Sequence, residues 1–338
     1  MMFLVLLASL TPAQAFTASS FRTLAKSRFS SSTLAANLDA STTFFFPGQG
    51  AQSLGMASSL PTAPALFKQA SEILNFDLLD AVTNGPKAHL DSTAISQPAI
   101  FVASMAAAQH LAATNPSAQA TVACGLSLGE YSALCFADAI SFEDGVRITK
   151  LRGEAMQAAS DAQPSGMVSV IGLPSSTVEE LCAKVRELTN EDIQVANFLC
   201  DGNYAVSGSK AACDKLCEIA KPDFKARMTV PLSVAGAFHT NFMAPAVPEL
   251  SSLLSTITIS PPRIPVISNV NALPHSDDPD TIREFLSKQV TSPVMWEATM
   301  KSLIASNYNI GYEVGPGKVI AGIMKRTDKT KEVVDVEV

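Results

Sequence analysis

The sequence predicts an α/β fold in which a parallel-sheet domain carries an inserted, smaller α+β subdomain. Two observations predict this architecture. Short apolar runs alternate with longer helix-forming stretches in the first part of the chain after its leader, which is typical of a parallel sheet covered on both faces. A β-α-β-β-α-β succession then occupies the middle of the chain, and helices and strands resume after it.

The composition is that of a folded protein and excludes several function classes. Of the 338 residues, 47% are apolar and 16% are charged, which excludes disorder as the general state. The formal net charge of −7 argues against a nucleic-acid partner, because phosphate binding needs a basic surface. No uncharged apolar stretch is long enough to predict a membrane-spanning helix.

The six cysteines predict neither a disulfide framework nor a zinc site. No two of them form the C-x-x-C pair that such sites commonly use. We expect the thiols to be buried and reduced, since a free cysteine packs as a small apolar side chain. No other cluster of metal-ligand residues is recognisable, so we expect no metal.

Residues 1–40 are expected to be a targeting leader. Residues 3–10 form a short apolar core, followed by the small-x-small cleavage pattern Ala13-Gln14-Ala15. Residues 16–38 are rich in Ser and Thr and contain basic but no acidic residues. This combination resembles the bipartite leader of algae with secondary plastids and predicts import into the plastid stroma. A secreted protein with a Ser-rich linker and a mitochondrial protein are the alternatives.

The first part of the mature chain alternates strand and helix. The apolar run TFFFP ends in a Pro-Gly turn, and ATVACG is a second buried strand. Ser141 and Asp144 open the last helix in a capping-box-like arrangement. The expected elements are strands at 43–47 and 120–125 and helices at 96–113, 127–138 and 141–160.

The β-α-β-β-α-β unit covers residues 166–230, which is long enough for a ferredoxin-like fold. After it we expect helices at 240–257, 280–290 and 295–306 and strands near 264–269 and 310–314. These elements define the domains. The large domain takes 41–162 and 232–328, the small subdomain 163–231, and a C-terminal tail 329–338.

A G-x-S-x-G motif, residues 125–129, lies between the strand 120–125 and a helix. This is the context of a nucleophile elbow, in which glycines relieve crowding around a strained serine. The hydroxyl of Ser127 would then sit at a helix N-terminus, which favours developing negative charge. The alternative is a Gly-Ser turn that caps the helix, but the strand before and the helix after favour catalysis.

A catalytic serine needs a base, and the chain has four histidines. His89 and His110 lie in helical stretches, and His275 lies in the polar loop PHSDD, where we expect it to be solvated. His239 follows the last strand of the small subdomain and starts a helix, so it is the favoured partner of Ser127. The alternative is a histidine at a helix start with no chemical role.

Seven separated motifs in order resemble one family, the malonyl-CoA:acyl-carrier-protein transacylases of type II fatty-acid synthesis. The resemblance runs from about residue 43 to 326 and is of the plant and algal type. It implies a hydrolase-like α/β domain with a ferredoxin-like insert. The motifs are FPGQGAQSLGM (46–56), SQPAIF (96–101), GLSLGEYSAL (125–134), KLRGEAMQ (150–157), VPLSVAGAFHTNFM (230–243), SPVMWEATM (292–300) and YEVGPGKVIAGIMKR (312–326).

The resemblance implies a role for each matching residue. Ser127 would be the nucleophile and His239 the general base and acid, oriented by the backbone carbonyl of Gln289. The backbone N–H groups of Gln49 and Leu128 would form the oxyanion hole.

A second set of residues would bind the acyl group. Arg152 would hold the malonyl carboxylate, because a guanidinium pairs with a carboxylate in a bidentate way. Met156, Asn197 and Phe238 would line the acyl pocket. For Arg152 the alternative is an exposed helix residue, and for Met156 it is core packing.

Three positions bear on how far the resemblance extends. Leu126 stands where bacterial members usually have His, and Leu199 where the family often has a second Asn. The first departure does not affect catalysis, whereas the second puts a thioester contact from residue 199 in doubt. Phe238, just before His239, is a hint of preference for malonyl over methylmalonyl groups.

The resemblance implies a ping-pong acyltransferase that moves malonyl from malonyl-CoA to the phosphopantetheine thiol of acyl carrier protein. The reaction exchanges thioester for thioester, so it implies no cofactor. The protein is expected to be a monomer. The alternatives are a serine hydrolase or thioesterase with the same elbow, which would not need Arg152, and a noncatalytic scaffold for carrier protein.

Overall fold

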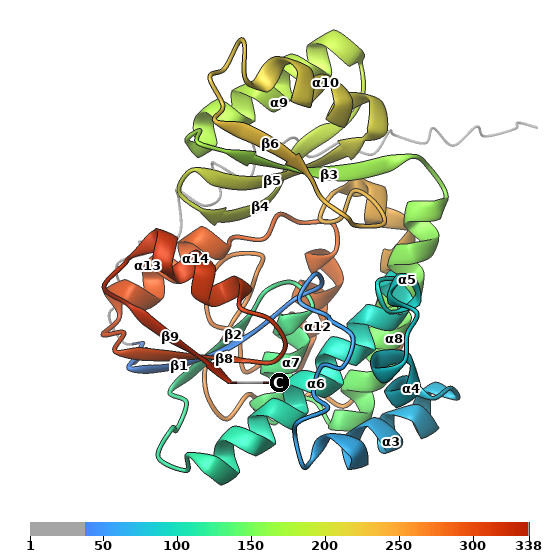
Figure 1. Cartoon of the computed structure of the whole chain (residues 1–338), viewed down its shortest axis with the longest axis vertical. Coiled ribbons are helices and arrows are strands. Elements are labelled where there is room, and N and C mark those ends of the chain that lie inside the picture. Colours follow the sequence, from blue (N-terminus) through green and yellow to red (C-terminus); the bar gives the residue numbers. More distant parts are fainter. Residues whose placement is uncertain (1–37, 337) are drawn as a thin grey trace, which may run out of the picture. The chain divides into compact units, whose positions relative to one another are not determined.

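The computed structural model describes residues 38–336 and residue 338, so most of the leader assigned to residues 1–40 lies outside the described residues. Two sheets organise the described chain (Figure 1). One has five parallel strands and the other has four antiparallel strands. The predicted fold class, a parallel α/β domain with a separate α+β unit, is confirmed.

The five-stranded sheet has the order β7-β2-β1-β8-β9. The central strand β1 pairs with β2 and β8, and residue Phe46 at its end lies opposite Gly125. Strand β9 was not expected, because its segment was assigned as a C-terminal tail; it forms the sheet edge next to β8. The strands are β1 (Thr42–Phe46), β2 (Val122–Gly125), β7 (Val266–Ile267), β8 (Ile310–Val314) and β9 (Glu332–Val336).

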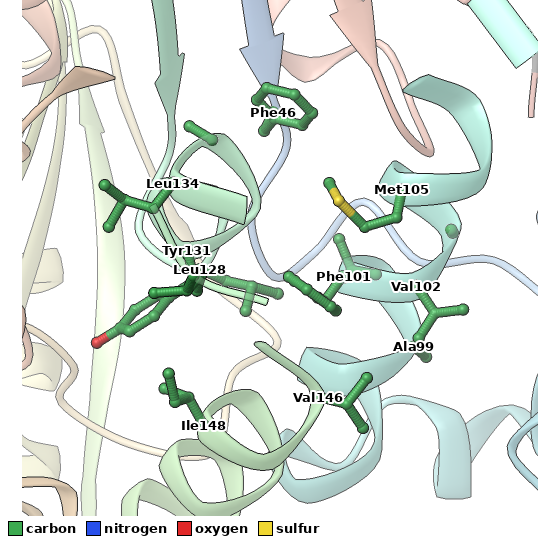
Figure 2. Packing of buried hydrophobic residues seen from close by; sticks show 14 of the residues in the cluster. Phe46, Ala99, Phe101, Val102, Met105, Leu128, Tyr131, Leu134, Val146 and Ile148 are labelled. Carbon is green, nitrogen blue, oxygen red and sulfur yellow. The ribbon is translucent and has the colours of Figure 1, made fainter. Parts of the chain in front are cut away.

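The three phenylalanines of β1 explain why this sheet is buried on both faces. Successive side chains of a strand point to opposite faces. Phe45 therefore packs edge-on to Trp296 in one cluster, with ring centroids 6.3 Å apart, whereas Phe44 and Phe46 join the main cluster. In Figure 2, Phe46 lies near Met105 in that main cluster.

Helices supply the other side of each cluster. The main cluster is built largely from α6 (Thr93–Thr114), α7 (Gly129–Phe136) and α8 (Phe142–Asp161), and the second from α13 (Trp296–Ala305) and α14 (Val319–Thr327). From residue 38 on, three further helices precede α6: α3 (Ala63–Leu74), α4 (Leu78–Thr83) and α5 (Lys87–Leu90).

The predicted cap of α8 is present. The Asp144 backbone N–H donates to the Ser141 hydroxyl oxygen at 3.0 Å, so the first turn of the helix is satisfied. The cap marks the start of α8, the helix that carries Arg152.

The four-stranded sheet has the predicted β-α-β-β-α-β succession and the order β4-β5-β3-β6. Val168 and Val170 of β3 face a separate core formed with α9 and α10, which lie on the same face of the sheet (Figure 1). Met167, on the other face, joins the main cluster, so this sheet packs against the larger unit. The elements are β3 (Ser165–Ile171), α9 (Ser175–Thr189), β4 (Ile193–Cys200), β5 (Asn203–Ser209), α10 (Lys210–Ala220) and β6 (Met228–Pro231).

The single helix expected at 240–257 is wrong in its first part. The chain forms a 3₁₀ helix, η1 (Asn241–Ala246), before α11 (Val247–Thr256), and α12 (Pro279–Gln289) follows. Pro245 lies inside η1 and lacks the N–H that a regular α-helix would use there. His239 therefore lies in the turn that precedes η1 and not in a helix.

Two further observations concern the described residues as a group. All six cysteines are free, and Cys135 and Cys217 are the two that are only partly buried. None of the helices between residues 38 and 338 combines the length and the apolar character that crossing a bilayer would require.

Candidate active site

Ser127 occupies a tight turn between β2 and α7. Its φ of 53° lies in the left-handed region, which is costly for a residue with a side chain. Both flanking residues must be glycine, because neighbouring backbone atoms leave no room for a Cβ at either position. A Cβ on Gly125 would lie 1.9 Å from the carbonyl carbon of Gly129, and a Cβ on Gly129 would lie 2.1 Å from the Phe46 oxygen. The serine is therefore presented by a nucleophile elbow.

Asn269, on the loop after β7, holds this strained turn in place. The Ser127 N–H donates to its Oδ1 at 2.6 Å, and its Nδ2 donates to the Gly125 carbonyl at 2.7 Å. One side chain thus satisfies a donor and an acceptor that the turn leaves unpaired.

The hydroxyl of Ser127 lies 2.8 Å from Nε2 of His239. Nδ1 of the same ring lies 2.9 Å from the carbonyl oxygen of Gln289. Because a carbonyl oxygen only accepts, Nδ1 carries the proton, and Nε2 of the neutral ring is free to accept the serine proton. The structure thus brings Ser127, His239 and the Gln289 carbonyl together in the order that the resemblance implied.

The environment keeps this imidazole neutral. His239 is 3% exposed, and its burial, together with the positive charge of Arg152, lowers its pKa to about 4. At neutral pH the ring is therefore almost entirely in the form that can take up a proton.

Arg152 lies beside the serine and is 1% exposed. Its guanidinium donates to Gln97 Oε1 at 2.7 Å, to Gln289 Oε1 at 2.9 Å and to Ser127 Oγ at 3.1 Å. Its Nε is buried and has no hydrogen-bond partner. Burial lowers the pKa of Arg152, but a guanidinium stays charged.

All three of these acceptors are neutral. In the part of the chain that the structure describes, no carboxylate forms an ion pair with Arg152. A buried cation whose hydrogen-bond acceptors are all neutral and which keeps a free donor is suited to binding an anion directly.

Two backbone N–H groups next to the serine have no partner among the described residues. They belong to Gln49, in the loop after β1, and to Leu128, which directly follows Ser127. That loop runs close to the elbow, since a Cβ on Gly48 would lie 2.3 Å from the Leu126 oxygen. These are the two groups predicted for an oxyanion hole.

The three residues assigned to the acyl pocket differ in their placement. Met156 lies one turn after Arg152, and its Sδ accepts from Gln97 Nε2 at 3.6 Å. Phe238 is 6% exposed and belongs to the main cluster. Asn197 shares no hydrogen bond with Ser127 or His239 among the described residues, and its Oδ1 is buried without a partner.

Comparison with known proteins places the chain in a family. The model of the acyl transferase domain matches residues 43–338. The mitochondrial malonyl-CoA-acyl carrier protein transacylase of Homo sapiens is 39% identical over 310 residues, which cover 86% of this chain and 79% of the human protein. The Bacillus subtilis transacylase is 35% identical over 297 residues, covering 87% and 92%.

The chain belongs to the malonyl-CoA-acyl carrier protein transacylase family. Solved members have the same fold. The transacylase of Coxiella burnetii superposes with a TM-score of 0.84 at 34% identity and covers 88% of this chain and 94% of its own. A malonyl-transacylase in complex with a type II PKS acyl-carrier protein gives 0.83 at 31% identity, with 88% and 96% covered. The prediction of an acyltransferase is therefore confirmed.

The prediction that the side chain of His275 is solvated is wrong. Its side chain is 1% exposed and not solvated, and its Nε2 lies 2.7 Å from Oε1 of Glu130. The polar residues next to His275 in PHSDD favoured a solvated loop and gave no sign of a buried contact. The loop turns back along β7, where the His275 N–H donates to the Val266 carbonyl at 2.8 Å, and this return directs the ring inward.

Three other residues at the site carried no prediction. Glu130, Gln97 and Asn269 each hydrogen-bond a residue that did carry one. Glu130 was visible as a charged residue in an otherwise apolar helix start, and Gln97 lies within the motif SQPAIF. Neither sequence feature shows which residue the side chain of Glu130 or of Gln97 contacts.

Proposed function

We propose that the protein transfers a malonyl group from malonyl-CoA to the phosphopantetheine thiol of acyl carrier protein, through an ester on Ser127. This reaction supplies fatty-acid synthesis with malonyl units. The single observation that supports it best is the buried guanidinium of Arg152, which lies 3.1 Å from the Ser127 hydroxyl and has only neutral partners. The free carboxylate of a malonyl group would pair directly with this guanidinium.

In the first half-reaction, Nε2 of His239 takes the proton of Ser127 while the oxygen attacks the thioester carbonyl of malonyl-CoA. The carbonyl becomes an oxyanion, which accepts hydrogen bonds from the N–H groups of Gln49 and Leu128. Each such donor contributes roughly 2.7–4 kcal/mol to the stability of a transition state of this kind. Collapse breaks the C–S bond, and His239 returns the proton to the departing CoA thiolate.

The second half-reaction runs the same steps with a different thiol. His239 removes the proton of the phosphopantetheine thiol, whose sulfur attacks the ester carbonyl. The C–O bond to Ser127 breaks, and the serine oxygen takes the proton back from the imidazolium. Gln289 orients the ring throughout, because its carbonyl accepts the hydrogen bond from Nδ1.

The acyl group would lie between Arg152 and the apolar side chains near it. Burial makes the guanidinium–carboxylate pair stronger than it would be in water and gives a reason to bind malonyl rather than acetyl groups. We assign Met156, Asn197 and Phe238 to the walls of this pocket. The unpaired Oδ1 of Asn197 supports a polar contact there.

The test is to mix the protein with malonyl-CoA, quench with acid, and map the adduct by mass spectrometry. We expect one malonyl group on the peptide that contains Ser127, discharged on addition of carrier protein bearing phosphopantetheine. Ser127→Ala should give no adduct. Release of free malonate without transfer would indicate a thioesterase, and the absence of an adduct in the wild type would overturn the proposal.

We further propose that residues 1–40 direct the protein to an organelle, and to the plastid in particular. The human and mouse relatives are mitochondrial proteins by name, which makes the mitochondrion the alternative. Support for the plastid comes from the apolar segment and small-x-small motif that precede the basic, Ser-rich stretch. Fusing residues 1–40 to a fluorescent protein distinguishes the two compartments.

A further inference from the structure

A buried carboxylate lies directly behind the site and is not used by the reaction above. Glu130, in the first turn of α7, has a fully buried side chain. Its Oε1 accepts from His275 Nε2 at 2.7 Å, and its Oε2 accepts from Gln289 Nε2 at 2.6 Å and from the Asn269 N–H at 3.1 Å. Three donors thus converge on one carboxylate, which compensates for its burial.

This carboxylate determines the orientation of the Gln289 side-chain amide, that is, which side its nitrogen and its oxygen face. An ionised carboxylate only accepts, so the amide must present its nitrogen to Glu130. Its oxygen then faces Nη2 of Arg152, at 2.9 Å. The reversed amide would place an NH₂ group against the guanidinium, donor against donor.

Gln289 is also the residue that orients the base. Its carbonyl accepts from Nδ1 of His239, and its Nε2 donates to the Ser127 carbonyl at 3.0 Å. One residue therefore contacts the nucleophile, the base and the guanidinium, and Glu130 fixes its side chain.

His275 is itself held firmly enough to position Glu130. Its N–H donates to the Val266 carbonyl, and its ring packs edge-on against Phe285 of α12, with centroids 6.2 Å apart and planes at 77°. Without the imidazole, Oε1 of this buried carboxylate would lose its hydrogen-bond donor, and the carboxylate would be held less firmly against Gln289.

We propose that His275 and Glu130 are positioning residues that set the direction of the Gln289 amide and thereby hold Arg152 for the substrate carboxylate. This inference rests on the proposed function, because its measure is the preference for malonyl over acetyl groups. A merely structural role would lower both activities together.

The test compares two variants of His275 with the wild type, in the full-length protein, by kcat/KM for malonyl-CoA and acetyl-CoA. His275→Leu removes the donor at similar volume, and we expect the malonyl-to-acetyl ratio to fall about tenfold, as for a lost hydrogen bond to a charged group. His275→Gln places an amide N–H at about the reach of Nε2 and should restore most of the ratio. If the Leu variant does not fold, His275→Asn, whose amide is too short, takes its place.

The same substitution is then made in an Arg152→Ala background. If His275 acts through Arg152, it should cause no further change in the ratio there, because the two effects are not additive. An unchanged ratio in His275→Leu, or equal losses with Gln and Leu, would overturn the inference. Both outcomes are distinct from failure of the proposed function, in which wild-type protein would not transfer malonyl at all.

Discussion

Ser127 and His239 share an unusual backbone conformation. Their φ angles are 53° and 60°, in a region that costs a non-glycine residue on the order of 1–3 kcal/mol. Side chains from elsewhere hold both turns: Asn269 bonds the Ser127 N–H, and Gln194 Nε2 donates to the His239 carbonyl at 3.3 Å. With both turns in this conformation, the Ser127 hydroxyl lies 2.8 Å from Nε2 of His239.

The low pKa of His239 predicts the pH dependence of the reaction. With a pKa of about 4 the free enzyme keeps its base neutral well below pH 6.5, the value at which an ordinary histidine is half protonated. We expect kcat/KM to change little between pH 8 and about pH 5.5, where an ordinary histidine would already have cost about tenfold. A half-maximal rate near pH 6.5 would contradict this assignment.

The same shift predicts the direction of a stability change. Between pH 6.5 and about 4 the unfolded chain binds a proton at residue 239 that the native protein does not. The free energy of unfolding therefore falls as the pH is lowered through this window. His239→Gln should flatten that dependence in denaturant titrations, and an identical slope in variant and wild type would show that the native ring titrates normally.

The roles at the site could be read from the sequence only where a motif carried them. Ser127 lies within the five-residue motif G-x-S-x-G, which by itself predicts a catalytic serine. His239 was favoured over the three other histidines only because it follows the last predicted strand of the small subdomain. The contact between Glu130 and His275 joins residues 145 apart. No local sequence pattern predicts such a pair, and the polar residues around His275 led to the wrong prediction that its side chain is solvated.

The elbow depends on how closely β1, β2 and α7 approach one another. Gly129 opens α7, and a Cβ added to it would lie 2.1 Å from the backbone oxygen of Phe46, at the end of β1. We expect Gly129→Ala to lower the free energy of unfolding by about 1–3 kcal/mol and to abolish most transfer, because the added methyl forces strand and helix apart.

Gly322 in α14 is the matched control for that substitution. A Cβ there would meet nothing within 4 Å. Gly322→Ala should leave the protein unchanged or stabilise it by about 0.5–1 kcal/mol, because alanine favours the helix. Equal effects of the two substitutions in chemical denaturation would show that the tight contact at Gly129 does not matter.

Elements were predictable where the pattern is local. The β-α-β-β-α-β succession shows its periodicity within each segment, and the start of α8 shows a cap at Ser141. Strand β9 was not predictable in the same way, because its place depends on pairing with β8 and its segment is mostly half-exposed. The 3₁₀ helix η1 was missed although Pro245 marks it.

At the scale of the whole molecule, segments far apart in sequence meet at one site. Ser127 follows β2, His239 follows the last strand of the antiparallel sheet, and Gln289 ends α12. The contact between Gln194 of β4 and the carbonyl of His239 ties the smaller sheet to the base. We propose that residues 163–231 are an inserted subdomain that forms one wall of the site.

Arg152 is buried beside Ser127, where we propose that it holds the free carboxylate of the substrate. The most direct measurement is kcat/KM for malonyl-CoA and acetyl-CoA in the wild type and in Arg152→Ala, with folding of both proteins checked. Malonyl transfer should fall on the order of a hundredfold, as for lost charge-assisted hydrogen bonds, while acetyl transfer is kept or rises. Equal losses for the two substrates would contradict the account.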